Sequence, residues 1–368
     1  MQHYDKSRMD VEKLGIRRKA ALELARQLTK NLRKEHPLRQ LFWESTVRCN
    51  IFCRHCGSDC RQAASTPDMP REDFFQVLDK IALKTNPGEV CVILGGGEPL
   101  VREDVVECAK GISERGFPWG MVTNALFLTP ELFGKLKDSG MTSITISLDG
   151  LEEQHTWLRR HPDCFRMADN AIDMIVADGQ LYYDVMTCVN QQNYDILPEL
   201  RDHLINKGVT DWRLATIFPV GRAAKDKELQ LTGKQMRGLF DFIKQTRKEG
   251  MIRASYGCEG FLGAYEGDVR DWMFRCEAGV TSASVLVDGS ISACTSIRYN
   301  YKQGNIYEDD FMDVWENRFQ KHRNHEWMRR DDCADCRFWR YCEGNGMHLR
   351  DDDGRLLLCH MKKMREEQ

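Results

Sequence analysis

Short apolar runs alternate with helix-like segments through the first two-thirds of the chain, and this alternation is the strongest constraint on its fold. The apolar runs are residues 41–46, 90–95, 120–124, 143–149, 182–189 and 211–218, and the helix-like segments that follow them are residues 71–84, 103–115, 130–139, 165–177, 196–207 and 232–249. Repeated strand-helix units predict parallel strands joined by right-handed crossovers. Six units fit either a partial barrel or an open doubly wound sheet, and periodicity alone does not choose between them.

The sequence pattern divides the chain into three parts. Residues 1–40 form an N-terminal extension with a basic amphipathic helix at 12–34, where leucines recur at helical spacing. Residues 41–250 hold the strand-helix units, and residues 251–368 are rich in cysteine and loops. We therefore expect one large α/β domain followed by a smaller cysteine-rich domain.

Charge and cysteine usage narrow the class of protein. The 53 basic and 56 acidic residues give a net charge of -3 without a long like-charge block, which predicts no nucleic-acid partner. No apolar run approaches the roughly 18 residues that cross a membrane, and the N-terminus lacks the apolar segment of a secretory signal. We expect a cytoplasmic protein whose 15 cysteines bind metal rather than form disulfides.

Three cysteines, Cys49, Cys53 and Cys56, follow the first expected strand in a C-x3-C-x2-C spacing. We expect them on a loop at the C-terminal end of that strand, where barrel active sites lie. Iron-sulfur clusters are normally held by four thiolates, so three thiolates leave one iron open to another molecule. The alternative is a zinc site with Cys60 as its fourth thiolate, although zinc sites usually pair two cysteine couples across a longer spacer.

The cysteine spacing resembles the signature of the radical S-adenosylmethionine (SAM) superfamily. The resemblance implies a partial (β/α)6 barrel and a [4Fe-4S] cluster whose open iron binds SAM. It also implies reductive cleavage of SAM to a 5′-deoxyadenosyl radical, with an electron donor such as flavodoxin or ferredoxin. The family's SAM contacts map onto the ends of the second, third and fourth strands, at Gly96, Gly97, Glu98, Asn124, Ser147 and Arg159.

Several of these residue types suit a SAM site on chemical grounds. Glycines at 95–97 allow a close backbone approach to a ligand, and Glu98 can accept a hydrogen bond from a ligand ammonium group. Arg159 can grip a carboxylate with two hydrogen bonds, although the adjacent Arg160 competes for that role. Four other cysteines match no ligand spacing and are expected to be structural, namely Cys91, Cys108, Cys164 and Cys188.

The cysteines of the C-terminal part resemble those of a SPASM domain, which carries auxiliary [4Fe-4S] clusters in radical SAM enzymes that modify peptides. Under this resemblance one cluster uses Cys333, Cys336, Cys342 and Cys359, and a second uses Cys258, Cys276 and Cys294. Gly346 stands where the second set usually has its fourth cysteine, so an open iron, another ligand such as His348, or absence of this cluster are the alternatives. A two-residue Asp288-Gly289 hairpin would bring Cys276 and Cys294 together.

The resemblance implies a post-translational maturase that abstracts hydrogen from a peptide or protein. The segments HPLRQLFWEST and CEGNGMHLR resemble radical SAM/SPASM proteins paired with a small lipoprotein in Bacteroidetes, so a lipoprotein precursor is the expected partner. A haem precursor is the alternative substrate, and a zinc-binding interaction protein is the alternative outside the superfamily. No catalytic side chain is assigned. Thr295 stands where sulfatase-maturating relatives have a basic aspartate, which argues against formylglycine formation.

Overall fold

The protein is described by a computed structural model that covers residues 10–64, 66–257 and 259–366. Its strands are β1 (Gln40–Thr46), β2 (Cys91–Gly96), β3 (Trp119–Thr123), β4 (Met141–Ser147), β5 (Tyr182–Val189), β6 (Asp211–Thr216), β7 (Arg253–Tyr256), β8 (Ser282–Val285), β9 (Ser290–Ser292) and β10 (Gly304–Asn305). Its α-helices are α1 (Ile16–Glu35), α2 (Arg71–Ala82), α3 (Val105–Glu114), α4 (Pro130–Asp138), α5 (Glu152–Arg159), α6 (Cys164–Asp178), α7 (Leu197–Asn206), α8 (Gly233–Glu249), α9 (Phe311–Asn317), α10 (Gln320–Arg323), α11 (Trp339–Cys342) and α12 (His360–Arg365).

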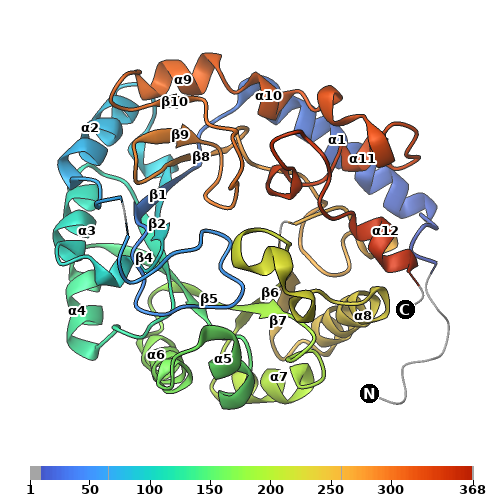
Figure 1. The fold of residues 1–368 in the computed structure, drawn as a ribbon, viewed down its shortest axis with the longest axis horizontal. Helices are drawn as coiled ribbons and strands as arrows, with labels where there is room; N and C mark the ends of the chain where they lie inside the picture. The colour runs from blue at the N-terminus through green and yellow to red at the C-terminus, as the bar shows by residue number, and fades with distance from the viewer. Residues whose placement is uncertain (1–9, 65, 258, 367–368) are drawn as a thin grey trace.

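All ten strands belong to one curved sheet in the order β10-β9-β8-β1-β2-β3-β4-β5-β6-β7. The strands from β8 to β7 run parallel, while β9 and β10 are antiparallel to their neighbours. Helices α2 to α8 lie around the outside of this sheet (Figure 1). The six expected strand-helix units are therefore confirmed, and the partial barrel is favoured over an open doubly wound sheet.

The core between the sheet and its helices follows from strand alternation. Leu41 and Trp43 of β1 are fully buried, and Trp43 stacks on Phe74 of α2 with ring centroids 4.2 Å apart. Residues at alternate positions of a strand point to one face, so these side chains pack outward against the helices. The opposite face of β1 turns toward the barrel interior.

Two features of the sheet were not expected from the sequence, the strand β7 and the pairing of β8 with β1. β7 follows α8 and adds a further parallel strand beside β6. β8, from the cysteine-rich part, pairs in parallel with β1 from Gln40↔Ser282 to Trp43↔Val285. The C-terminal part therefore extends the barrel sheet at its β1 edge.

The hairpin at Asp288 and Gly289 is confirmed, but the two-residue loop is wrong. The backbone N–H of Leu286 donates to the carbonyl of Ser290 at 2.9 Å, and that of Gly289 donates back to Leu286 at 2.9 Å. The loop is therefore residues 287–289, a turn closed by a bulge in which Gly289 has a φ of +81°.

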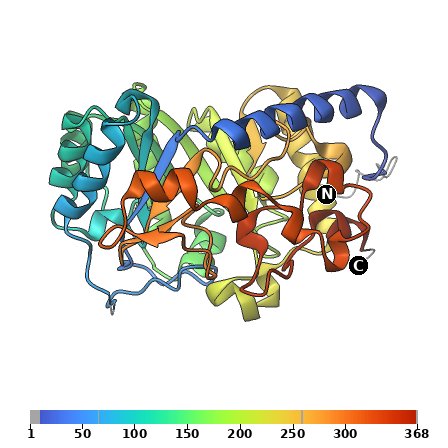
Figure 2. The same cartoon turned by 90° about the horizontal axis from the view of Figure 1, so that it is seen from above.

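The N-terminal helix is confirmed as α1, although its packed face differs in part from the expectation. Leu22 is buried, whereas Leu24 is 74% exposed. Figures 1 and 2 show α1 beside α10 and α11, and Glu23 of α1 pairs with Arg340 of α11. Within the described residues, no helix combines the length and the apolar character that crossing a membrane requires.

Candidate active site

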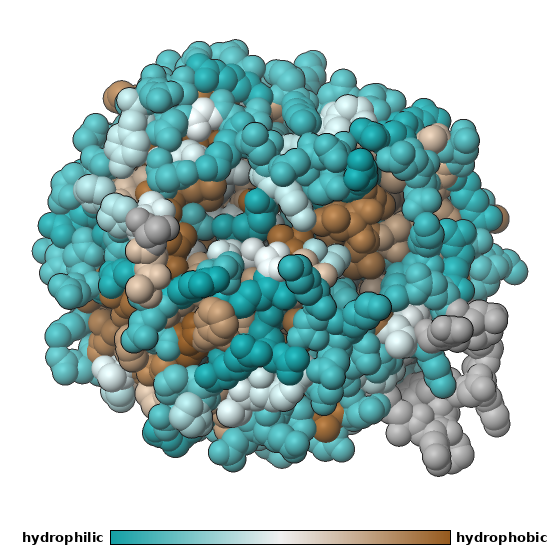
Figure 3. All heavy atoms as spheres, in the orientation of Figure 1, coloured by the Kyte–Doolittle hydropathy of each residue, from teal (hydrophilic) through white to brown (hydrophobic). Residues whose placement is uncertain are grey.

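The loop that follows β1 places Cys49, Cys53 and Cys56 on the wall of one cavity of about 280 Å³. Cys49 and Cys53 are buried, and Cys56 is partly buried. The cavity is also lined from the C-terminal ends of β2 to β6, as expected for a barrel site. In the space-filling view, the centre of this face carries neutral and apolar residues within a hydrophilic border (Figure 3).

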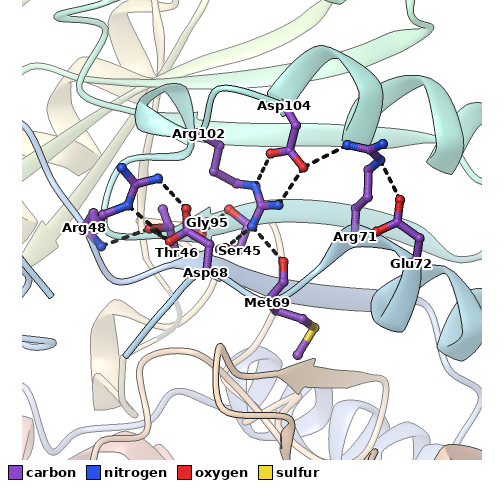
Figure 4. A network of polar contacts seen from close by, with 10 residues as sticks. All are labelled: Ser45, Thr46, Arg48, Asp68, Met69, Arg71, Glu72, Gly95, Arg102 and Asp104. Atoms are coloured by element: carbon purple, nitrogen blue, oxygen red, sulfur yellow. Dashed lines mark hydrogen bonds and ion pairs between the residues drawn. The ribbon is translucent and has the colours of Figure 1, made fainter. Parts of the chain in front are cut away.

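A polar network fixes both ends of the cysteine loop (Figure 4). Arg48, just before Cys49, pairs with Asp68 beyond the end of the loop. Arg102 is 4% exposed and donates to the carbonyl oxygens of Ser45 at 2.7 Å and Met69 at 3.0 Å. The loop is thus held at its base before any ligand binds.

Gly96 and Gly97 lie at the end of β2 against the end of β1. A Cβ atom at Gly96, where φ is +117°, would lie 2.2 Å from the carbonyl oxygen of Thr46, and one at Gly97 would lie 2.0 Å from that of Arg48. The backbone at Gly96 and Gly97 therefore closely approaches the end of β1 and the start of the cysteine loop, and not a ligand alone. Gly97 also lines the cavity.

Glu98 lines the cavity and is 1% exposed. Its carboxylate accepts from the hydroxyl of Thr123 at 2.7 Å and from the backbone N–H groups of Asn124 at 2.8 Å and Leu100 at 3.1 Å. Burial raises the pKa of Glu98, although these donors oppose the shift. The donors orient the carboxylate and leave acceptor capacity for a ligand ammonium group.

Asn124 connects the end of β3 to the cysteine loop. Its Nδ2 donates to Asn50 Oδ1 at 2.8 Å and lies 3.9 Å from Cys49 Sγ. Asn50 Nδ2 is buried without a hydrogen-bond partner among the described protein atoms. Amide donors next to a cysteine sulfur are typical of the surroundings of an iron-sulfur cluster.

Arg159 reaches the same cavity from the C-terminal end of α5. Its Nε donates to Asp149 Oδ2 at 2.5 Å, and its Nη1 lies 3.9 Å from Cys53 Sγ. Arg159 is 8% exposed, whereas Arg160 is exposed to solvent. Ser147, at the end of β4, lines the cavity as well. The structure therefore brings Arg159, and not Arg160, to the cysteines.

Asp149 holds Arg159 in place and was missed in the sequence. Burial raises the pKa of Asp149, but the charge and hydrogen bond of Arg159, together with the nearby rings of His55 and His155, lower that pKa to about 2. Its second oxygen accepts from the backbone N–H of Cys188 at 2.8 Å. The available signal was its place in the ISLDG segment, two residues after Ser147.

The three thiols differ in their ionisation. Burial raises the pKa of Cys49 to about 12 and that of Cys53 to about 11. A hydrogen bond with Cys60 lowers the pKa of Cys56 to about 5. Because metal ligands are thiolates, binding a cluster here would release protons from Cys49 and Cys53 at neutral pH.

Two further residues line the cavity, and one of them departs from the expectation. Cys188, expected to be structural, lines the cavity at the end of β5. Arg222 lines it too, but its guanidinium donates to the carbonyl oxygens of Cys53 at 2.7 Å and Cys60 at 3.0 Å. Arg222 therefore holds the cysteine loop itself.

The first C-terminal group of cysteines is brought together. Ionisation of Cys342 is coupled electrostatically to Cys359 and Cys333, and that of Cys359 to Cys333 and Cys336, so these four thiols are neighbours. Burial raises the pKa of Cys342 and of Cys359. Arg350 Nη2 donates to Cys333 Sγ at 3.4 Å.

The second group is described only in part, because Cys258 lies outside the described residues. Cys276 is coupled electrostatically to Cys294, as the hairpin predicts. The backbone N–H of Met347 donates to Cys276 Sγ at 3.5 Å, which places the segment around Gly346 at this group.

The donor sets of these sites fit iron-sulfur clusters in kind: clustered thiols with nearby N–H donors. All fourteen described cysteines are free thiols. Within residues 10–64, 66–257 and 259–366, no three His, Cys, Asp or Glu side chains converge closely enough to hold a single metal ion.

Two family models match the chain. Residues 43–204 match the model of the radical SAM superfamily. Residues 276–337 match the SPASM model, described as an iron-sulfur cluster-binding domain.

Relatives of established activity cover most of the chain. An AdoMet-dependent heme synthase of Methanosarcina barkeri is 24% identical over 83% of this chain and 90% of its own length. The mycofactocin maturase MftC of Mycolicibacterium smegmatis is 29% identical over 83% of this chain and 77% of its own length.

Solved structures share the fold. The structure of anSMEcpe with bound AdoMet and the Cp18Cys peptide has a TM-score of 0.66 at 19% identity, over 89% of this chain and 94% of that chain. SuiB of Streptococcus suis bound to its precursor peptide SuiA has a TM-score of 0.65 at 17% identity, over 99% of this chain and 82% of that chain.

Proposed function

Since the chain is a radical SAM enzyme in which a radical SAM domain is followed by a SPASM domain, we propose that it modifies a ribosomally made peptide or protein. The radical SAM domain implies a [4Fe-4S] cluster and SAM, and the SPASM domain implies auxiliary iron-sulfur clusters. When bound and reduced, the [4Fe-4S] cluster of the radical SAM domain would supply the one electron that cleaves SAM into methionine and a hydrogen-abstracting 5′-deoxyadenosyl radical. The zinc-binding interaction protein is set aside.

Within this proposal each cavity residue has a role. Cys49, Cys53 and Cys56 hold the cluster, and Arg159 and Ser147 bind the methionine carboxylate of SAM. Glu98, oriented by three donors, accepts from the methionine ammonium group. Gly96, Gly97 and Asn124 fix the backbone and the loop against which SAM lies. The arrangement supports the proposal because these side chains come from different elements and converge on one cavity.

The charge of the cavity is the observation that favours a peptide over a haem precursor. Two arginines line the cavity, and within this proposal both are committed: Arg159 to Asp149 and the carboxylate of SAM, and Arg222 to the cysteine loop and Asp59. Burial lowers the pKa of His55 to about 3, so its ring is neutral. Porphyrin precursors carry several carboxylates that need cationic partners when desolvated. A peptide makes no such demand.

The relatives include enzymes for both substrate classes, and they favour a peptide over a porphyrin. SuiB and anSMEcpe have been solved with peptides, and the mycofactocin maturase is more similar in sequence than the heme synthases. The coverage of the heme synthase, 90% of its length, keeps a porphyrin as the second candidate.

The proposed lipoprotein precursor rests on the sequence resemblance alone, and so does a flavodoxin or ferredoxin donor. Free thiols throughout the described residues support action in the cytoplasm.

The test is a competition between the two substrates. Anaerobically reconstituted protein is incubated with SAM, dithionite and either the peptide encoded beside its gene or an iron porphyrin precursor. We expect a mass change in the peptide that depends on SAM. Conversion of the porphyrin together with an unchanged peptide would contradict the proposal.

A further inference from the structure

His348 lies where the second C-terminal cysteine group lacks its usual residue. A Cβ atom at Gly346 would lie 2.7 Å from Cε1 and 2.9 Å from Nδ1 of His348. The imidazole ring therefore occupies the space into which any side chain at position 346 would project. A cysteine at that position and the present His348 ring exclude each other.

The same segment touches a thiol of this group. Met347, between Gly346 and His348, donates its backbone N–H to Cys276 Sγ at 3.5 Å. Ser282 is bridged to Ala278, two residues after Cys276, and donates its hydroxyl to the carbonyl oxygen of Ala293, the neighbour of Cys294, at 3.3 Å. The turn Met347–Leu349 is thus fixed beside the two described thiols of the group.

The ring of His348 has a polar atom that the protein does not satisfy. His348 is 8% exposed, and its Nε2 is buried without a hydrogen-bond partner among the described atoms. One side of the ring packs on Phe218, with centroids 4.8 Å apart, and His348 is not among the residues lining the SAM cavity. Leaving a buried ring nitrogen unpaired is unfavourable, so a partner for it is expected.

From these observations we infer that His348 is a ligand, through Nε2, of the auxiliary iron-sulfur cluster that Cys276 and Cys294 hold. The Nε2 lone pair bonds to iron while Nδ1 keeps its proton, so no electron is transferred in forming the bond. A neutral imidazole in place of a thiolate makes the cluster less negative, which raises its reduction potential. The inference rests on the proposed assignment of Cys276 and Cys294 to a cluster.

The experiment uses the full chain with Cys49, Cys53 and Cys56 changed to Ser, so that only auxiliary clusters remain. The protein is produced with ¹⁵N-labelled histidine. Its clusters are then reconstituted anaerobically and reduced, and the sample is studied by pulsed electron paramagnetic resonance. We expect hyperfine coupling from a directly bound histidine nitrogen. His348→Cys should keep the iron content, abolish the coupling and lower the potential, while His348→Gln should lose one cluster of iron.

Two other buried histidines provide the controls. His322 is fully buried with both ring nitrogens unpartnered, and His322→Gln should leave the coupling unchanged. His325 has an unpartnered Nε2 and lines a hollow beside Cys276. Loss of the coupling in His325→Gln but not in His348→Cys would overturn the inference, as would an intact cluster without histidine coupling.

The outcomes separate this inference from the proposed function. A histidine-coupled auxiliary cluster in a protein that does not cleave SAM would refute the function and leave the ligand in place. Cleavage of SAM without histidine coupling would refute the ligand and leave the function in place.

Discussion

Under the proposed function, Arg159 is the residue whose placement decides how SAM is held. It is buried between Asp149 and Cys53, whereas its neighbour Arg160 is exposed. Lysine cannot keep the bond to Asp149 and also grip a carboxylate. Arg159→Lys should therefore weaken SAM binding about 10- to 100-fold, in keeping with the loss of a charged hydrogen bond. Equilibrium dialysis with SAM measures this, and Arg160→Lys is the matched control. Equal losses in both variants would refute the assignment.

Asp149 makes stability depend on pH. Its folded pKa of about 2 is below the unfolded value of 3.8, so its contribution is present above pH 3.8 and is lost as the pH falls toward 2. The shift corresponds to about 2 kcal/mol. Urea unfolding of cluster-free protein at pH 5 and pH 2.5 measures it. Asp149→Asn should be less stable at pH 5 and lose less stability on acidification; an unchanged pH dependence would count against the ion pair.

At this scale the sequence identified residues that line the cavity better than it identified the residues that hold them in position. Cys49, Cys53, Cys56 and Arg159 were found because spacing and chemistry mark them. Asp149 was not, because its partner Arg159 is a side chain brought close only by folding. Cys188 has no spacing signal at all, and only the position of β5 brings it to the cavity.

Among the elements, the cysteine loop depends on a clamp made by Arg102. This buried guanidinium bonds Ser45, Met69 and Asp104, so removing its charge leaves buried acceptors and a carboxylate unpaired. Arg102→Gln should lower the free energy of unfolding by about 3 kcal/mol and impair retention of the cluster. Arg71 pairs with the same Asp104 from a more exposed position, and Arg71→Gln should cost under about 1 kcal/mol. Denaturant unfolding with iron analysis measures both, and similar losses would contradict the clamp.

The regular elements of the barrel were predictable because each is coded locally. All six expected strands and the helices after them are present, with bounds that differ by a few residues. β7 was not predicted, since a strand of four residues carries little periodic signal. β8 is the first strand of the predicted hairpin, but its parallel partner was not predicted. The pairing of β8 with β1 joins segments far apart in sequence, and no local pattern specifies such a pairing.

On the scale of the whole molecule, Glu44 couples the barrel to the C-terminal part. It is 3% exposed on β1 and pairs with Arg298 at 2.8 Å. Glu44→Gln leaves the partly buried guanidinium of Arg298 without its charge partner, which should cost about 2 kcal/mol. The exposed pair of Glu89 and Arg39 is the control, where Glu89→Gln should change stability by under about 1 kcal/mol. Urea unfolding monitored by tryptophan fluorescence distinguishes them, and equal effects would argue against this coupling.

The most direct test of the account is SAM cleavage by the anaerobically reconstituted full chain with dithionite, followed as 5′-deoxyadenosine. The wild type and Cys60→Ser should form it, because Cys60 is buried beside the cysteine loop but is not a ligand in this account. Cys53→Ser should form none. Equal product from Cys53→Ser, or none from a wild-type protein that holds its clusters, would contradict the central claim that three thiolates leave an iron open to SAM.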